Sequence, residues 1–173
     1  MTENLRFMVD HNVGRLARWL RMMGYDTRLF TGDNDSDMVA LARREGRVTL
    51  TRDTQIMKRR LVTSGEIRAL LMDSDQPEAQ MRQVIATLKL NPEFNPFSLC
   101  LECNQPLVER TPAEVAGQVP PFVFKTQQQY MMCPKCQRIY WRGTHWQAMT
   151  GKLKEFSRPP DESGGSHDQT GLR

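Results

Sequence analysis

The first ninety residues alternate between short apolar runs and amphipathic segments with helical period. The apolar runs predict strands at 5–10, 26–30, 47–51 and 67–72. The segments that follow them predict helices at 13–24, 36–46, 55–65 and 76–90. Strands that alternate with helices in this way predict a parallel sheet with right-handed crossovers, which is an α/β domain over 1–90.

Local signals mark the ends of these helices. Gly24 and Gly46 follow the first two helices and are predicted C-caps. Ser36 or Asp35 is the predicted N-cap of the second helix, and Pro77 is placed in the first turn of the fourth.

The pattern changes at 91–98, where prolines and asparagines break the helical period and predict a linker. The segment 118–132, QVPPFVFKTQQQYMM, shows no helical period, so short strands and turns are expected in a small second domain at 99–150. The polar, Gly/Ser/Pro-rich stretch 157–173 predicts a disordered tail.

Composition describes a soluble chain that can still build a core. Of its 173 residues 39% are hydrophobic, and the mean hydropathy is −0.58. No apolar run approaches the roughly 20 residues that cross a bilayer, so no membrane partner is expected. The first residues lack a signal-peptide pattern, which predicts a cytoplasmic protein. The net charge of +4 and the pI near 9.0 lean only mildly toward nucleic acid.

All four cysteines fall in the second half as two Cys-x-x-Cys pairs, Cys100/Cys103 and Cys133/Cys136. Two such turns supply the four sulfurs of a tetrahedral zinc site, so we predict a structural zinc ribbon. The alternatives are a redox Cys-x-x-Cys pair or four unrelated thiols.

Aromatic and cationic residues interleave directly after the second pair, in QRIYWRGTHW. They could stack on bases and pair with phosphates, or pack the ribbon onto the first domain. The candidates for nucleic-acid contact are Arg138, Tyr140, Trp141, Arg142 and His145.

Aspartates follow three of the four predicted strands. They are Asp10, Asp53 and Asp73, and the loop after the second strand adds Asp35 and Asp37. The carboxyl ends of parallel strands meet at one edge of a sheet, where ligands bind. Clustered carboxylates stay ionised only beside a cation, and oxygen ligands favour Mg²⁺ or Mn²⁺. Such an ion can activate water against a phosphodiester. Each aspartate alone is also explained by helix capping or turn chemistry.

Basic residues surround this edge. On a helical wheel Arg15, Arg18 and Arg21 share the polar side of the first helix, and Arg52 and Lys58 flank Asp53. We expect them to contact phosphates, although an ordinary solvated face is the alternative.

The stretches FMVDHNVGRLARWLRMMGYDT, ALARREGRVTLTRD and CLECN…CPKCQRIYWRGTHW resemble the Mut-seven-C RNase family over about 5–150. The resemblance implies a PIN-like α/β/α nuclease domain followed by a zinc ribbon, and a metal-dependent ribonuclease. Asp10 and Asp53 match two of the family's acidic positions, and Asp37 or its neighbour Asp35 matches a third. Asp73 is placed at the fourth acidic position of the family, where the residue type varies. His11 beside Asp10 has no assigned role.

The sequence therefore predicts a ribonuclease with Zn in the ribbon and Mg or Mn at the aspartates. Its partner is RNA, with tRNA, rRNA and mRNA not distinguished. Two alternatives stay open: an RNA- or ribosome-binding module without catalysis, and a protein–protein adaptor on the same fold.

Overall fold

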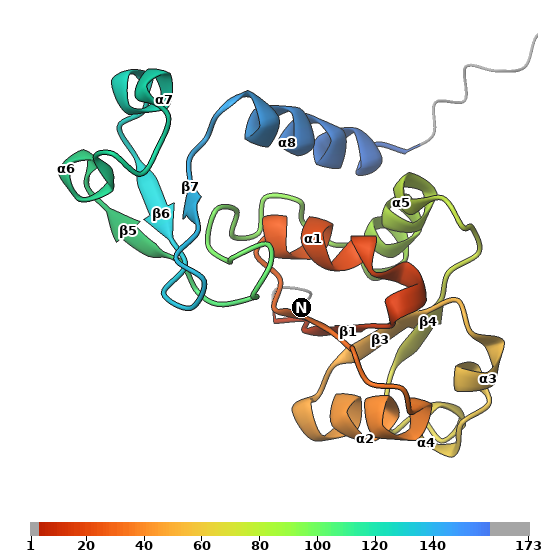
Figure 1. Ribbon diagram of the computed structural model, residues 1–173. Helices are drawn as coiled ribbons and strands as arrows, with labels where there is room; N and C mark the ends of the chain where they lie inside the picture. Colours follow the sequence, from red (N-terminus) through yellow and green to blue (C-terminus); the bar gives the residue numbers. More distant parts are fainter. Residues whose placement is uncertain (1–3, 160–173) are drawn as a thin grey trace, which may run out of the picture.

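The computed structural model describes residues 4–159 (Figure 1). Its first part contains a parallel four-stranded sheet in the order β2-β1-β3-β4, which confirms the predicted mixed α/β class. In register, Phe7 of β1 pairs with Thr27 of β2 and with Val48 of β3. The strands are β1 Phe7–Val9, β2 Thr27–Leu29, β3 Val48–Thr51 and β4 Ala69–Leu71.

Helices cover both faces of this sheet (Figure 1). Alternate residues of β1 point in opposite directions, so Phe7 and Val9 join one buried core and Met8 joins another. The first core packs against a 3-10 turn and two helices: η1 His11–Val13, α1 Arg15–Met22 and α5 Pro77–Leu88. The second packs against α2 Asp35–Glu45, α3 Thr54–Met57 and α4 Arg60–Thr63.

Two of the predicted helix ends are confirmed, whereas the C-cap of α1 is Met23 and not the predicted Gly24. Gly46 closes α2 in the left-handed conformation, and Pro77 opens α5. The predicted N-cap of α2 is wrong, because the side chain of Asn34 accepts the hydrogen bond from the Ser36 amide. The single helix predicted at 55–65 is also wrong. It is interrupted at Arg59, whose backbone is extended and whose guanidinium donates to Ser36 Oγ at 2.8 Å.

The second part is built around an antiparallel sheet in the order β5-β6-β7. Its elements are β5 Val108–Arg110, α6 Pro112–Val115, α7 Pro121–Thr126, β6 Tyr130–Met132 and β7 Ile139–Tyr140. The expectation of strands and turns alone between the cysteine pairs is therefore wrong. α6 forms because Thr111 and Glu114 make a capping box, and Pro121 opens α7 at a position where a missing amide costs nothing.

A last helix, α8 Thr144–Phe156, was not predicted. It leaves the small sheet and returns over α1 and α5, so Trp146, Met149 and Phe156 enter the first core (Figure 1). The Phe156 ring meets Trp19 edge to face at 5.7 Å between centroids, and the guanidinium of Arg82 lies over it. This helix ties the end of the described chain to the first domain.

The segment predicted as a linker packs closely against the first domain. Phe94 stacks on Tyr25, and Phe97 is buried. A Cβ built on Gly24, where φ is +94°, would meet the Asn95 carbonyl oxygen at 2.2 Å, so only glycine allows this approach. The division into domains at 1–90 and 99–150 stays a prediction.

Of the predicted tail, residues 160–173 lie outside the described residues. Across 4–159, every helix is too short or too polar to cross a bilayer.

Candidate functional site

Two backbone turns of the same design carry the cysteines. In the first, the Cys100 amide donates to the Gln105 carbonyl, and the Asn104 amide donates to the Cys100 carbonyl. The second repeats this pattern from Cys133 to Arg138 and from Gln137 to Cys133. Asn104 and Gln137, the residues after each pair, both have φ of 61°. The two turns are therefore matched knuckles, each of which directs two sulfurs to the same side.

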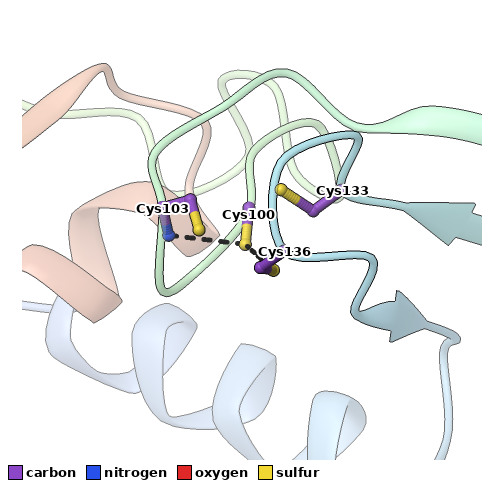
Figure 2. A group of neighbouring side chains, drawn as sticks. All are labelled: Cys100, Cys103, Cys133 and Cys136. Carbon is purple, nitrogen blue, oxygen red and sulfur yellow. Dashed lines mark hydrogen bonds between the residues drawn. The ribbon is translucent and has the colours of Figure 1, made fainter.

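The four sulfurs converge, and each lies within 4.8 Å of the others (Figure 2). Cys100 Sγ and Cys136 Sγ are 3.7 Å apart. A tetrahedral zinc ion with Zn–S bonds of about 2.3 Å places its sulfurs about 3.8 Å apart. The cluster could hold a metal ion such as zinc, as the sequence predicts.

The electrostatics of the cysteine cluster favour a bound cation. Burial opposes ionisation of the Cys100 thiol, but hydrogen bonds from Tyr140 and the knuckle amides outweigh it and lower its pKa to about 7. Desolvation and the neighbouring thiols Cys136 and Cys100 raise the pKa of Cys103 to about 12. Four thiolates at this spacing therefore need a positive ion between them.

The first knuckle docks onto the α/β domain through Arg21. This guanidinium is buried and donates to the carbonyls of Leu101 at 2.8 Å and Glu102 at 3.2 Å. Asn104 adds to this contact between the knuckle and the α/β domain, which we call the joint, because its side chain accepts a hydrogen bond from the Thr27 amide and donates one to Asp26. The knuckle thereby caps the β2 edge of the parallel sheet.

In the middle of the sheet, the neighbouring strands β1 and β3 flank the point where the strand order reverses. The connection after β1 leads to β2 on one side, and the connection after β2 crosses to β3 on the other. Ligands of open α/β sheets bind outside the carboxyl ends of the strands at such a point. Asp10 directly follows β1, and Asp53 follows β3 after one residue.

Asp10 is a buried carboxylate without a fixed cationic partner. It is 3% exposed, its Oδ2 accepts from Thr51 Oγ1 at 2.8 Å, and its Oδ1 lies 3.0 Å from His11 Nδ1. His11 is itself exposed, and no lysine or arginine within 4–159 pairs with Asp10. A carboxylate in this position suits a bound cation.

Thr51 connects Asp10 to Asp53. Its hydroxyl donates to Asp10 and accepts from the Asp53 amide at 3.0 Å. The side chain of Asp53 accepts from the Gln55 amide at 2.8 Å and so caps α3. One buried hydroxyl thus links the Asp10 carboxylate to the backbone of Asp53.

The other predicted carboxylates stand on other elements. Asp35 and Asp37 stand in the first turn of α2, and Asp73 is exposed after β4, where its amide donates to Gln83. Among the described residues, the cysteines form the only group of three or more possible metal ligands within reach of one another. The structure links Asp10 to the Asp53 backbone through Thr51 and gathers no three of the predicted carboxylates within 4–159.

The predicted phosphate-contacting residues are also divided. Arg15, Arg52 and Lys58 are exposed. Arg18 is half-buried and pairs with Glu102 at 2.5 Å. Arg21 is buried under the first knuckle and has no free guanidinium to offer a phosphate.

The aromatic cluster is mainly structural. The hydroxyl of Tyr140 lies 3.2 Å from Cys100 Sγ and accepts from the Leu101 amide. Trp141 packs on the small core of the ribbon at Val115 and Tyr130. Beside them, Arg138 and His145 are exposed, and Arg142 lies over the Phe97 ring at 4.9 Å.

Two residues at the sheet edge were not singled out in the sequence. Thr51 links the two aspartates, and Asn12 Oδ1 accepts from the Arg52 amide at 3.2 Å. A polar residue at the end of a buried strand, beside an aspartate, is the signal that could have identified Thr51.

Comparison with known proteins gives one finding. The model of the Mut7-C RNAse domain family matches residues 5–153. Neither the curated proteins nor the solved structures contain a match. Since the match spans most of the chain and includes both the sheet edge and the cysteine knuckles, the chain belongs to the Mut7-C RNAse domain family.

Proposed function

We propose that the protein is a metal-dependent ribonuclease that hydrolyses RNA phosphodiester bonds at the edge between β1 and β3, on a PIN-like domain. The main support is the buried Asp10 carboxylate, which lies where the strand order of the sheet reverses. It has no lysine or arginine partner within 4–159, and Thr51 links it to the backbone of Asp53. Membership of an RNase domain family makes RNA the expected substrate.

Asp10 and Asp53 form the proposed ligand pair. Their oxygens suit Mg²⁺ or Mn²⁺, which is commonly bound by one or two carboxylates while water and substrate phosphate complete the shell. Such an ion, when bound, lowers the pKa of a ligated water and neutralises charge on the phosphate. Asp35 and Asp37 in the first turn of α2, and Asp73 after β4, stay proposed contributors.

The remaining groups of the chain position the ligands and the substrate. The Thr51 hydroxyl fixes the rotamer of Asp10 and the backbone of Asp53. Arg52 stands exposed between Thr51 and Asp53, where its charge can meet a phosphate. The cysteine cluster is proposed to hold structural zinc, because four sulfur ligands leave no position for substrate.

The test is cleavage of a fluorescently labelled RNA in the presence of Mn²⁺. We expect Asp10→Asn and Asp53→Asn to lose more than about 100-fold in rate, since even indirect supports of a metal site are commonly worth 10–100-fold. Asp33→Asn, an exposed aspartate without a side-chain partner in the described structure, is the matched control. Equal rates in all four proteins would refute the assignment of the site.

A second readout does not depend on activity. Mn²⁺ at 100 times its dissociation constant stabilises a protein by about 2.7 kcal/mol. The melting temperature of the wild type should therefore rise on addition of Mn²⁺, and that of Asp10→Asn should not. An identical rise in both proteins would place the ion elsewhere.

One observation favours a second candidate, RNA binding without cleavage. Asp35, Asp37 and Asp73 do not join Asp10 in a common ligand group within 4–159. That candidate predicts RNA affinity that is unchanged by Mn²⁺ and by Asp10→Asn, with no product in any protein.

A further inference from the structure

A groove runs between α1 and α8, away from the cysteines and beside the sheet edge. It encloses about 500 Å³ and is lined by Arg15, Arg18, Trp19, His145, Ala148 and Lys152, together with Met149. A second pocket of about 380 Å³ adjoins it at the ribbon, and the two share Arg18, His145 and Met149. The two pockets therefore adjoin each other along α1.

The charged side chains that line this groove are all positive. Its lining includes three cationic side chains and the imidazole of His145, and neither pocket is lined by an aspartate or glutamate. Arg18 and Lys152 are partly neutralised by Glu102 and Glu78. Arg15 and His145 have no ion pair or side-chain hydrogen bond within 4–159. The groove thus presents unpaired positive charge to solvent.

Helix stability does not explain Arg15. It is the first residue of α1, where a cation opposes the helix dipole. The residue is exposed, and it lines both the α1–α8 groove and a neighbouring polar pocket. A polyanionic ligand would make this charge favourable.

The pocket at the ribbon differs in chemistry from the rest of the groove. Its walls include Ile139, Tyr140, Trp141, Trp146 and Met149, so most of its surface is apolar and aromatic. An aromatic slot beside a basic track is the arrangement that captures a base while the track holds the backbone. Bases of a duplex are stacked on each other and cannot enter such a slot, whereas unpaired bases can.

The groove also leads toward the proposed catalytic edge. The polar pocket that shares Arg15 has a volume of about 630 Å³ and is lined by His11 and Asn12, which directly follow Asp10. His11 Nδ1 lies 3.0 Å from Asp10 Oδ1. One face of α1 therefore connects the aromatic slot at the ribbon to the neighbourhood of Asp10.

We propose that this groove binds single-stranded RNA, with one unpaired base in the slot beside Trp141 and the following phosphates on Arg18, His145, Lys152 and Arg15. The strand then reaches the Asp10 edge at a fixed distance from the captured base. The arrival at a cleaving site rests on the proposed function, whereas the binding itself does not.

The test measures binding of the zinc-loaded full chain to a labelled single-stranded RNA by fluorescence anisotropy, without added Mg²⁺ or Mn²⁺. Ala148→Glu puts a carboxylate into the groove from an exposed position of α8, and we expect it to raise Kd at least roughly tenfold. Gln147→Glu is the matched control, because it adds the same charge at the adjacent exposed position, which lines neither pocket. The control should stay within about twofold of the wild type, since a screened surface charge has little effect.

Two further measurements separate the parts of the proposal. Arg15→Gln should reduce the slope of log K against log salt by about 0.7, the value for one phosphate contact on a single strand. Arg44→Gln, an exposed arginine on α2 across the sheet, should leave the slope unchanged. A blunt duplex of the same sequence should bind at least roughly tenfold more weakly than the single strand.

The inference is overturned if Ala148→Glu and Gln147→Glu bind alike, if the duplex competes equally, or if the wild type binds no RNA. The proposed ribonuclease fails separately, if the wild type binds the single strand in this groove and yields no product with Mn²⁺. A protein ligand in place of RNA would show as salt-insensitive occupancy of the groove with no RNA affinity, which also overturns the inference.

Discussion

The cysteine cluster and the aspartates of the sheet edge are held by different kinds of structure. Each cysteine pair stands on one short backbone turn. The two turns have the same hydrogen-bond pattern, and each contains one residue in the left-handed conformation. The aspartates come from separate loops, and Asp53 caps a helix while Asp10 accepts from Thr51. The four sulfurs consequently lie within 4.8 Å of one another, whereas no three of the carboxylates within 4–159 form such a group. A site that repeats a local motif is set by a few neighbouring residues, whereas a site assembled from separate segments depends on how the whole domain packs.

The largest effect is expected when the cysteine site is broken. Cys133 is buried, and Cys133→Ser should abolish tight zinc binding and unfold the ribbon, because structural zinc supplies about 10–16 kcal/mol in small zinc domains. Native mass spectrometry should find one zinc in the wild type and none in the variant. Hydrogen exchange should lose protection in β5, β6 and β7, and zinc restored to chelated wild type should recover it. Retained protection without zinc would show that the ribbon folds by packing alone.

The joint between the two regions is expected to have the second largest effect. Arg21→Met leaves the Leu101 and Glu102 carbonyls without their donor in a buried place, which should cost about 3 kcal/mol of the free energy of unfolding. Arg18→Met, at a half-exposed ion pair with Glu102, should cost no more than about 1 kcal/mol. Urea unfolding of the zinc-loaded proteins measures both. Equal losses would mean that the knuckle is not docked through Arg21.

The same joint should respond to acid through Asp26. Burial opposes ionisation of this carboxyl, but hydrogen bonds from Arg47, Asn104 and Arg6 outweigh it and hold its pKa at about 2. Because this value lies below the usual 3.8, the stabilisation is fully present above that pH and is lost as the pH falls toward 2. Allowing for its partial exposure, the loss should be about 1 kcal/mol.

The control for this acid effect is Asp26→Asn, whose side chain cannot ionise. Zinc release at low pH affects the wild type and the variant alike, so it cancels in the difference between them. The difference in unfolding free energy between wild type and variant should shrink between pH 5 and pH 2. A constant difference over this range would show that Asp26 titrates normally in the folded chain.

The cysteine site and the aspartate edge also differ in how much of each could be predicted from the sequence. The cysteine site was predictable because its geometry is set within a few residues, and the four parallel strands were predictable from short apolar runs. The buried positions of α8, Trp146, Met149, Leu153 and Phe156, do recur at helical spacing, but the aromatic cluster before them drew the interpretation toward RNA contact. The burial of Arg21 could not be predicted, because it depends on where a segment eighty residues away docks. The distances among the aspartates have the same dependence on tertiary structure.

The smallest expected change in stability tests the double role of Asp53. Its carboxylate caps α3 by accepting from the Gln55 amide, and it is also a proposed metal ligand. Asparagine caps helices about as well as aspartate, so Asp53→Asn should change the free energy of unfolding by less than about 0.5 kcal/mol, whereas Asp53→Ala should cost about 1 kcal/mol. Both variants remove the charge that an ion requires, so both should lose the Mn²⁺-dependent rise in melting temperature. If Asp53→Asn keeps that rise, Asp53 is a cap alone, and the carboxylate edge reduces to Asp10.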